Sequence, residues 1–198
     1  MEVEWYGQSA FRLAASQATV VIDPFDDMSG LASRGLQFDY PAIEGVTADL
    51  LLVTHEHRDH NGVEVVAGDP VILRSTAGRH SSPIGEVIAV ASEHDEAAGT
   101  ERGGNTIFAF ELDGLRVCHF GDFGQGALRE EQAAAIVDRI SPRWVVPMHY
   151  RTPRIGFLET ADAFLEGQAY VERLQGSVFD TAALPVQDDA VAVVPAAP

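Results

Sequence analysis

The sequence predicts an α/β fold in which sheets are flanked by outer helices, and three observations support this class. Short apolar segments separated by turn residues fill the first half of the chain. Strand-like and helix-like segments alternate in the second half. The 198 residues, 46% of them hydrophobic, suffice to bury one core, and no stretch has the composition of a linker. We therefore expect one domain over residues 1–198.

The first half is expected to consist mainly of strands. Pro24 ends an early strand, residues 26–41 have the composition of a loop, and Asn61–Ala67 is expected to form a short helix. The apolar run Leu50–Thr54 is typical of a strand that is buried on both faces. The expected strands are Val3–Tyr6, Ala10–Leu13, Thr19–Ile22, Leu50–Thr54, Val71–Leu73 and Val87–Ala91.

Helices are expected only in the second half, where they alternate with strands. Asp113-Gly114 predicts a two-residue hairpin between Ile107–Leu112 and Leu115–Phe120. The clearest helix is Leu128–Ile140, because its apolar residues recur at helical spacing. The remaining expectations are strands at Trp144–Pro147 and Ala190–Val194 and a helix over Ala161–Leu174, with a break near Gly167.

Charge and composition narrow the classes of partner. Thirty acidic and thirteen basic residues give a formal net charge of −17, which repels nucleic-acid phosphates and anionic membranes. The expected partner is therefore a small-molecule substrate rather than nucleic acid or a membrane. Cys118 is the single cysteine, which excludes an intrachain disulfide, and its apolar surroundings predict burial. The first residues lack a signal-peptide pattern, so we expect a cytoplasmic protein.

The most informative segment is the hexapeptide His55-Glu56-His57-Arg58-Asp59-His60, which follows the buried strand Leu50–Thr54. It contains three of the seven histidines of the chain. Imidazole is the commonest biological metal ligand, and carboxylate accompanies it at hydrolytic sites. His55 and His57 are two residues apart, so both rings can reach one ion, while Asp59 and His60 can point at a second. The segment predicts a metal site that acts on water.

Three further candidate ligands each follow a predicted strand. His94 follows Val87–Ala91, Asp122 follows Leu115–Phe120, and His149 follows Trp144–Pro147. Taken singly, a strand-end aspartate usually forms a turn and a lone histidine is usually structural. Together they share one placement, and we expect the ends of several strands to converge on one edge of the fold.

These residues, in this order, resemble the metallo-β-lactamase superfamily, and most closely its small metal-dependent hydrolases similar to ascorbate-6-phosphate lactonase. The hexapeptide matches the complete His-x-His-x-Asp-His motif of that family. The resemblance also rests on Trp5–Phe11, Val21–Phe25, Gly121-Asp122 and Pro147–Tyr150. It implies the αββα fold, a sandwich of two sheets with outer helices.

The resemblance also implies a site for two divalent metal ions. Zinc is the first expectation, and manganese and iron suit the same donors. Asp23 is expected to orient a ligand by hydrogen bonding, with a plain Asp-Pro turn as the alternative. His80 and His119 remain alternatives to His94. The implied ligand sets are His55, His57 and His94 for one metal, and Asp59, His60 and His149 for the other, with Asp122 bridging.

The implied activity is hydrolysis of a small ester, lactone or phosphoester by a metal-bridging hydroxide, with Asp59 as the catalytic proton acceptor. Arg102, Tyr150 and Arg151 are candidate substrate-binding residues, with surface charge or packing as the alternatives. Two other classes stay open. One is a phosphodiesterase that acts on nucleotides or nucleic acid, and the other is a metal protein that is redox-active or inactive.

One segment departs from the family pattern. Only 26 residues separate Asp122 from His149, whereas members of the family carry an extra strand and a Gly-rich loop there. We therefore expect one strand to be missing from the C-terminal half. One hypothesis is that a partner subunit covers the exposed sheet edge, which makes a homo-oligomer an expectation that sedimentation tests.

Overall fold

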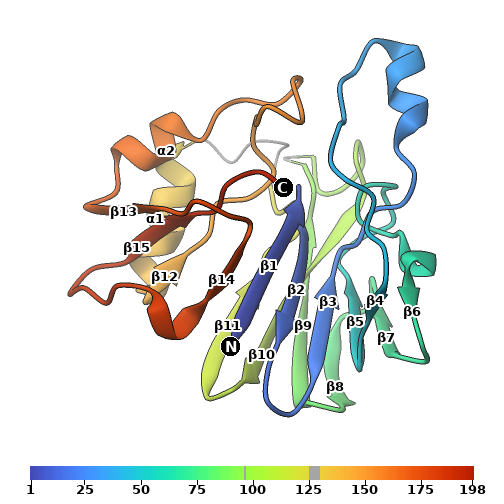
Figure 1. Cartoon of the computed structure of the whole chain (residues 1–198), viewed down its shortest axis with the longest axis horizontal. Coiled ribbons are helices and arrows are strands. Elements are labelled where there is room, and N and C mark those ends of the chain that lie inside the picture. The colour runs from blue at the N-terminus through green and yellow to red at the C-terminus, as the bar shows by residue number, and fades with distance from the viewer. Residues whose placement is uncertain (96, 125–129) are drawn as a thin grey trace.

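The computed structural model describes residues 1–95, 97–124 and 130–198. Its largest sheet has the strand order β14-β1-β2-β3-β5-β7 (Figure 1). β14, β1, β2 and β3 run antiparallel, whereas β3, β5 and β7 run parallel. Since parallel strands end at the same edge, Asp23 after β3 and the hexapeptide after β5 emerge together. The bounds are β1 Glu2–Gly7, β2 Ala10–Ala14, β3 Thr19–Ile22, β5 Leu50–Val53, β7 Val71–Arg74 and β14 Val178–Asp180.

A second sheet, with the order β11-β10-β9-β8, is built from antiparallel neighbours. The predicted hairpin at Asp113-Gly114 is confirmed, because Leu112 pairs with Leu115 and both turn residues have a positive φ. β8 was not among the strands expected from the sequence. The bounds are β8 Gly78–Ser82, β9 Gly85–Glu93, β10 Gly104–Leu112 and β11 Leu115–His119.

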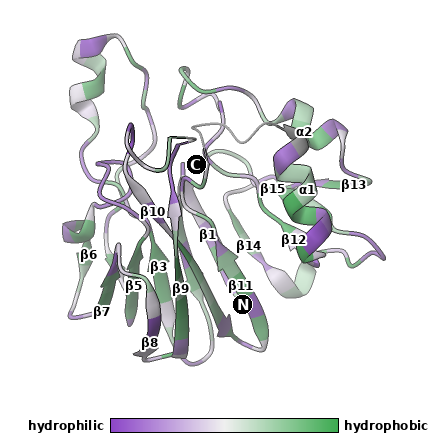
Figure 2. Ribbon diagram, turned by 180° about the vertical axis from the view of Figure 1, so that it is seen from behind, coloured by the Kyte–Doolittle hydropathy of each residue, from purple (hydrophilic) through white to green (hydrophobic). Residues whose placement is uncertain are grey.

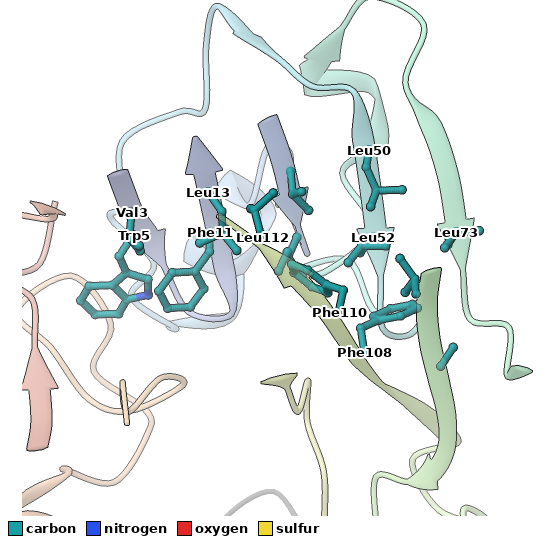
Figure 3. Packing of buried hydrophobic residues seen from close by; sticks show 14 residues of the cluster. Val3, Trp5, Phe11, Leu13, Leu50, Leu52, Leu73, Phe108, Phe110 and Leu112 are labelled. Atoms are coloured by element: carbon teal, nitrogen blue, oxygen red, sulfur yellow. The ribbon is translucent and has the colours of Figure 1, made fainter. Parts of the chain in front are cut away.

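The main core lies between these two sheets. Figure 3 shows Leu50 and Leu52 of β5, with Trp5 and Phe11, facing the side chains of β10. β10 contributes three buried residues at alternate positions, Phe108, Phe110 and Leu112. This alternation is the period of two that a strand imposes, so one face of each sheet is buried against the other. The predicted sheet sandwich agrees with this arrangement.

The outer face of the large sheet is covered by loops and short elements rather than by a long helix. All four residues of β5 are buried, because Leu51 packs on this side while Leu50 and Leu52 pack in the core. The helix expected over Asn61–Ala67 is wrong: one 3₁₀ turn leads into a short strand. Its valines are β-branched and favour extended backbone. The covering elements are η1 Ser29–Arg34, β4 Val46–Thr47, η2 Val63–Val65 and β6 Val66–Ala67.

The C-terminal part forms a separate parallel sheet with the order β12-β15-β13 (Figure 1). The expected helix over Ala161–Leu174 is wrong beyond Gly167, because Tyr170–Arg173 pairs with β15 as a strand. The helix expected from Leu128 is described only from Glu130, and Leu128 lies outside the described residues. The bounds are α1 Glu130–Ile140, β12 Trp144–Val145, α2 Asp162–Glu166, β13 Tyr170–Arg173, η3 Thr181–Ala183 and β15 Val191–Val194.

β11 forms an edge of the second sheet. Within the described ranges it pairs with β10 alone, and β12 belongs to another sheet. Burial of Cys118 was wrong: Val117 and His119 alternate toward the interior, so Cys118 is exposed on the other face. Hydrophobic residues follow the strands of both sheets (Figure 2). No helix among the described residues is long and apolar enough to span a bilayer.

Candidate metal centre

The hexapeptide folds back on itself where β5 ends. The backbone N–H groups of His60 and Asn61 both donate to the carbonyl of His57, at 2.9 and 3.1 Å. This turn directs the side chains to one place. His55 and His60 are buried, His57 is exposed, and Asp59 is half-buried. The segment therefore presents donors at several depths of one site.

The other three candidates come from different strand ends. His94 follows β9, Asp122 follows β11 through Gly121, and His149 follows β12. Gly121 has a φ of +56°, and a Cβ there would collide with the side chains of Asn105 and Thr54. Glycine is thus required for the turn that carries Asp122 into the site.

Nitrogen and carboxylate atoms of these residues converge in three groups, each with its donor atoms within 4.8 Å of one another. Two groups coincide with the ligand sets that the resemblance implies, and the third links them through Asp122. The groups are His55, His57 and His94; His55, His60 and Asp122; and Asp59, His60 and His149.

The Asp122 carboxylate lies between the two ligand sets. Its Oδ2 is 3.0 Å from His94 Nε2 and 3.4 Å from His149 Nε2. Its Oδ1 is 3.3 Å from His60 Nε2. Oδ2 thus faces nitrogens from two strand ends and Oδ1 faces a nitrogen from a third, so this carboxylate contacts residues of both ligand sets.

Several of these atoms are buried without a hydrogen bond, which tests whether the donors fit a metal. His60 Nε2, His149 Nε2 and Asp122 Oδ1 are inaccessible and have no hydrogen-bond partner. Burying a polar atom without a partner is costly, and a divalent cation would satisfy all three. Imidazole nitrogens and carboxylate oxygens are the donor types for zinc, manganese and iron. The residues therefore fit such a cation.

Burial and mutual charge set the protonation of the cluster without metal. Burial lowers the pKa of His55 to about 4, and the charge of His60 adds to this. Burial also disfavours the charged form of His60, but Asp122 and Asp23 outweigh it and raise its pKa well above the ordinary value. Burial opposes ionisation of Asp122, yet the positive charges of His60 and His149 hold its pKa well below the usual range. The centre therefore keeps its carboxylate ionised among histidines.

Asp23 organises the buried side of the site, where it is fully inaccessible. Its Oδ1 accepts from the backbone N–H of Thr54, and its Oδ2 accepts from the Thr54 hydroxyl, both at 2.7 Å. The same Oδ2 lies 2.9 Å from His60 Nδ1. Asp23 thus holds Nδ1 and directs Nε2 toward Asp122, so Nε2 is the nitrogen that a cation could bind.

Asp23→Asn is expected to lower metal affinity about 10- to 100-fold, the usual cost of losing a partner that orients a histidine ligand. Competition with a chromogenic chelator measures this affinity. Asp26→Asn is the matched control, because Asp26 is exposed three residues away. Equal affinities of the two variants would contradict this role for Asp23.

The two alternatives to His94 lie elsewhere. His119 is a core residue whose Nε2 is 3.0 Å from the Ser9 carbonyl, and its ring meets Phe11 edge-on. His80 lies within β8 rather than at a strand end. Of the three, only His94 joins a donor group among the residues that the structure describes.

The three candidate substrate-binding residues differ in their surroundings. Arg102 is exposed and lines the same cavity as His94. Burial lowers the pKa of His94 and the charge of Arg102 adds weakly to this, but Asp122 outweighs both, so the pKa is raised. Tyr150 stacks on Trp5, with ring centroids 5.7 Å apart, and burial raises its pKa to about 12. Arg151 donates to the Leu158 carbonyl. Packing thus accounts for Tyr150, and a loop contact accounts for Arg151.

Sequence reasoning missed residues that support the ligands. The Thr54 hydroxyl is 3.1 Å from His55 Nδ1 and, because it donates to Asp23, it accepts from that nitrogen. The carboxylate of Asp95 accepts four backbone N–H groups of the loop after His94. Asn105 contacts the turn before Asp122. Only Thr54 and Asp95 had a signal in the sequence, which was their position beside a ligand.

Comparison with known proteins places this geometry in a family. Residues 2–130 match the family model described as the beta-lactamase superfamily domain. A UPF0173 metal-dependent hydrolase of Thermococcus kodakarensis is 29% identical over 77% of this chain and 85% of that protein. One from Cupriavidus taiwanensis is 28% identical over 76% of this chain and 74% of that protein.

A solved structure supports the fold. It belongs to a Thermotoga maritima protein assigned to the zinc-dependent hydrolases of the metallo-beta-lactamase superfamily. The TM-score is 0.72 at 23% identity, with 98% of both chains covered. At this identity the likeness shows the fold. The chain therefore has the fold of that superfamily, and the likeness extends over its whole length.

Proposed function

We propose that this chain, which belongs to the beta-lactamase superfamily and is a metal-dependent hydrolase, binds two divalent cations at its site and cleaves a small ester, lactone or phosphoester. One observation carries the proposal: the Asp122 carboxylate lies between two three-residue donor groups. We assign His55, His57 and His94 to one cation, and Asp59, His60 and His149 to the other. Zinc is the first candidate metal.

Bound cations would supply Lewis acidity and would lower the pKa of water toward neutrality. The chain's own groups would hold and orient them. Asp122 would keep the two ligand sets in register through its two oxygens, and Asp23 would hold His60 with Nε2 toward the centre. Thr54 would do the same for His55.

Asp59 is the proposed proton acceptor. Burial opposes its ionisation, but His149, whose Nε2 lies 3.5 Å from Asp59 Oδ2, and the charge of His60 lower the pKa of Asp59 to about 2. It is therefore ionised at neutral pH. Its side chain keeps 24% of its surface exposed, against 7% for Asp122, so it could accept a proton from the attacking water at the open side of the site.

A large open cavity extends from the site across the second sheet and the C-terminal part, and it leaves the donor groups accessible to a substrate. It measures 2410 Å³ and its lining includes His57, Asp59, His94, Asp122 and His149. Arg102 also lines it and offers one cation to a substrate carboxylate or phosphate. A chain with a net charge of −17 is poorly suited to polymeric nucleic acid.

The proposal is tested by elemental analysis combined with a panel of lactones and phosphodiesters. We expect close to two divalent ions per chain and hydrolysis of at least one class of substrate. His57→Ala should lose metal and about 10²- to 10³-fold in kcat/KM, since one metal ligand contributes several kcal/mol. His80→Ala is the matched control, because His80 lies outside the donor groups. Absence of metal after reconstitution, or equal loss in both variants, would refute the proposal.

A further inference from the structure

The structure assigns a positioning role to Asn105: we infer that its side-chain amide sets the placement of the Asp122 carboxylate against His94. The inference rests on the proposed two-cation function. Asn105 lies near the beginning of β10 and is 3% exposed, so its amide interacts with protein rather than with solvent. Asn105 contacts the backbone of a proposed metal-ligating residue, Asp122, so its role is to position that residue rather than to act on the substrate.

The amide of Asn105 makes three hydrogen bonds, which use both of its donor hydrogens and its acceptor. Oδ1 accepts from the backbone N–H of Asp122 at 3.1 Å. Nδ2 donates to the carbonyl of Phe120 and to the hydroxyl of Ser92, both at 2.8 Å. One side chain therefore forms hydrogen bonds with the backbone on both sides of Gly121.

The bonds to Phe120 and Asp122 lie just beyond the point where the pairing of β10 with β11 ends. The last paired residues of β10 and β11 are Phe108 and His119. Beyond them the chain turns at Gly121, so the carbonyl of Phe120 and the N–H of Asp122 leave the ladder. Asn105 satisfies both groups from the neighbouring strand. A buried backbone group without a partner is costly, so this amide holds the turn in one conformation.

The Ser92 bond extends the same network to the first ligand set. Ser92 lies on β9, two residues before His94, and it pairs directly with Asn105 in the β9–β10 ladder. One amide therefore joins the end of β9, which carries His94, to the turn that carries Asp122. The 3.0 Å separation of Asp122 Oδ2 and His94 Nε2 depends on both. Small displacements matter here because metal ligation tolerates only a few tenths of an ångström.

Asn105→Leu keeps a similar size but removes all three bonds, and Asn105→Ala avoids overcrowding if leucine prevents folding. Each variant is freed of metal by chelation and titrated with Co²⁺ and Zn²⁺ at a temperature where circular dichroism shows it folded. We expect one of the two ions to bind about 10- to 100-fold more weakly, with altered Co²⁺ ligand-field bands. Thr106→Val is the matched control, because Thr106 is the next residue of β10 and equally buried.

Ser92→Ala separates positioning from simple packing of β9 on β10. It removes the bond from Asn105 Nδ2 to the Ser92 hydroxyl and the 3.3 Å bond from that hydroxyl to the Asn105 backbone carbonyl, and it leaves the bonds to Phe120 and Asp122. We therefore expect a smaller loss of metal affinity in Ser92→Ala than in the Asn105 variants. Wild-type affinity and spectrum in a folded Asn105 variant would overturn the inference, and so would equal losses in Ser92→Ala or Thr106→Val. Fewer than two ions in the wild-type chain would instead refute the proposed function.

Discussion

Replacing Asp122 with alanine is expected to remove most of the bound metal and at least about 10³-fold of the hydrolytic rate, while the chain stays folded. Its two oxygens approach the ring nitrogens of His60, His94 and His149 within 3.4 Å. Loss of this carboxylate disconnects the two donor groups and leaves several imidazoles without their negative neighbour. A metal centre contributes several kcal/mol to the transition state, and each 1.36 kcal/mol is about tenfold in rate.

Metal content per chain, kcat/KM and the thermal midpoint test this expectation together. Asp69→Ala is the matched control, because it makes the same change in net charge at an exposed residue of the β6–β7 connection. We expect the control to keep both ions and the full rate. Two ions and an unchanged rate in Asp122→Ala would show that this carboxylate does not link the two donor groups.

Phe108→Ala is expected to destabilise the fold by about 3–5 kcal/mol, the usual cost of truncating a fully buried aromatic residue. Phe108 is completely inaccessible and lies between the two sheets, with Leu52 on the facing strand (Figure 3). The surrounding strands are fixed by their ladders and cannot collapse into the cavity. Because a whole domain is stable by only about 5–15 kcal/mol, this loss is a large fraction of the total.

Urea unfolding followed by circular dichroism, with all proteins in the same metal state, measures the change. Phe157→Ala is the matched control, since Phe157 is 43% exposed, and we expect a change within about 0.5 kcal/mol. If the two substitutions cost the same, the space between the sheets is not the core of this fold.

The sequence predicted elements well where the pattern is local. The apolar run of β5 and the hairpin turn at Asp113-Gly114 are readable because burial on both faces and a positive φ select particular residues at particular positions. The sequence did not predict the strands β13 and β14, because their pairing is not local. β14 is paired to β1, with Asp180 opposite Glu2, and β13 to β15, with Tyr170 opposite Val191. Such pairing depends on partners far away in the chain, which a local pattern does not contain.

The candidate site divides in the same way. The hexapeptide could be recognised because its donors are contiguous and follow a strand. Sequence alone left His80, in an expected loop, and His119, within an expected strand, as alternatives to His94, because a local pattern does not show which of them meets the hexapeptide. The structure separates them: His119 faces the core, His80 lies within β8, and only His94 reaches the others.

By itself, then, the sequence determined the types of donor and their places at strand ends, because an apolar strand followed by histidine and aspartate is a local pattern. The tertiary structure decided which donors face one another. Asp122 lies between His60 and His94 only because two sheets pack face to face and bring the ends of β5, β9 and β11 to one edge. The tertiary structure also places Asn105 beside Asp122. Its proposed role depends on hydrogen bonds between strands, which the sequence pattern does not indicate.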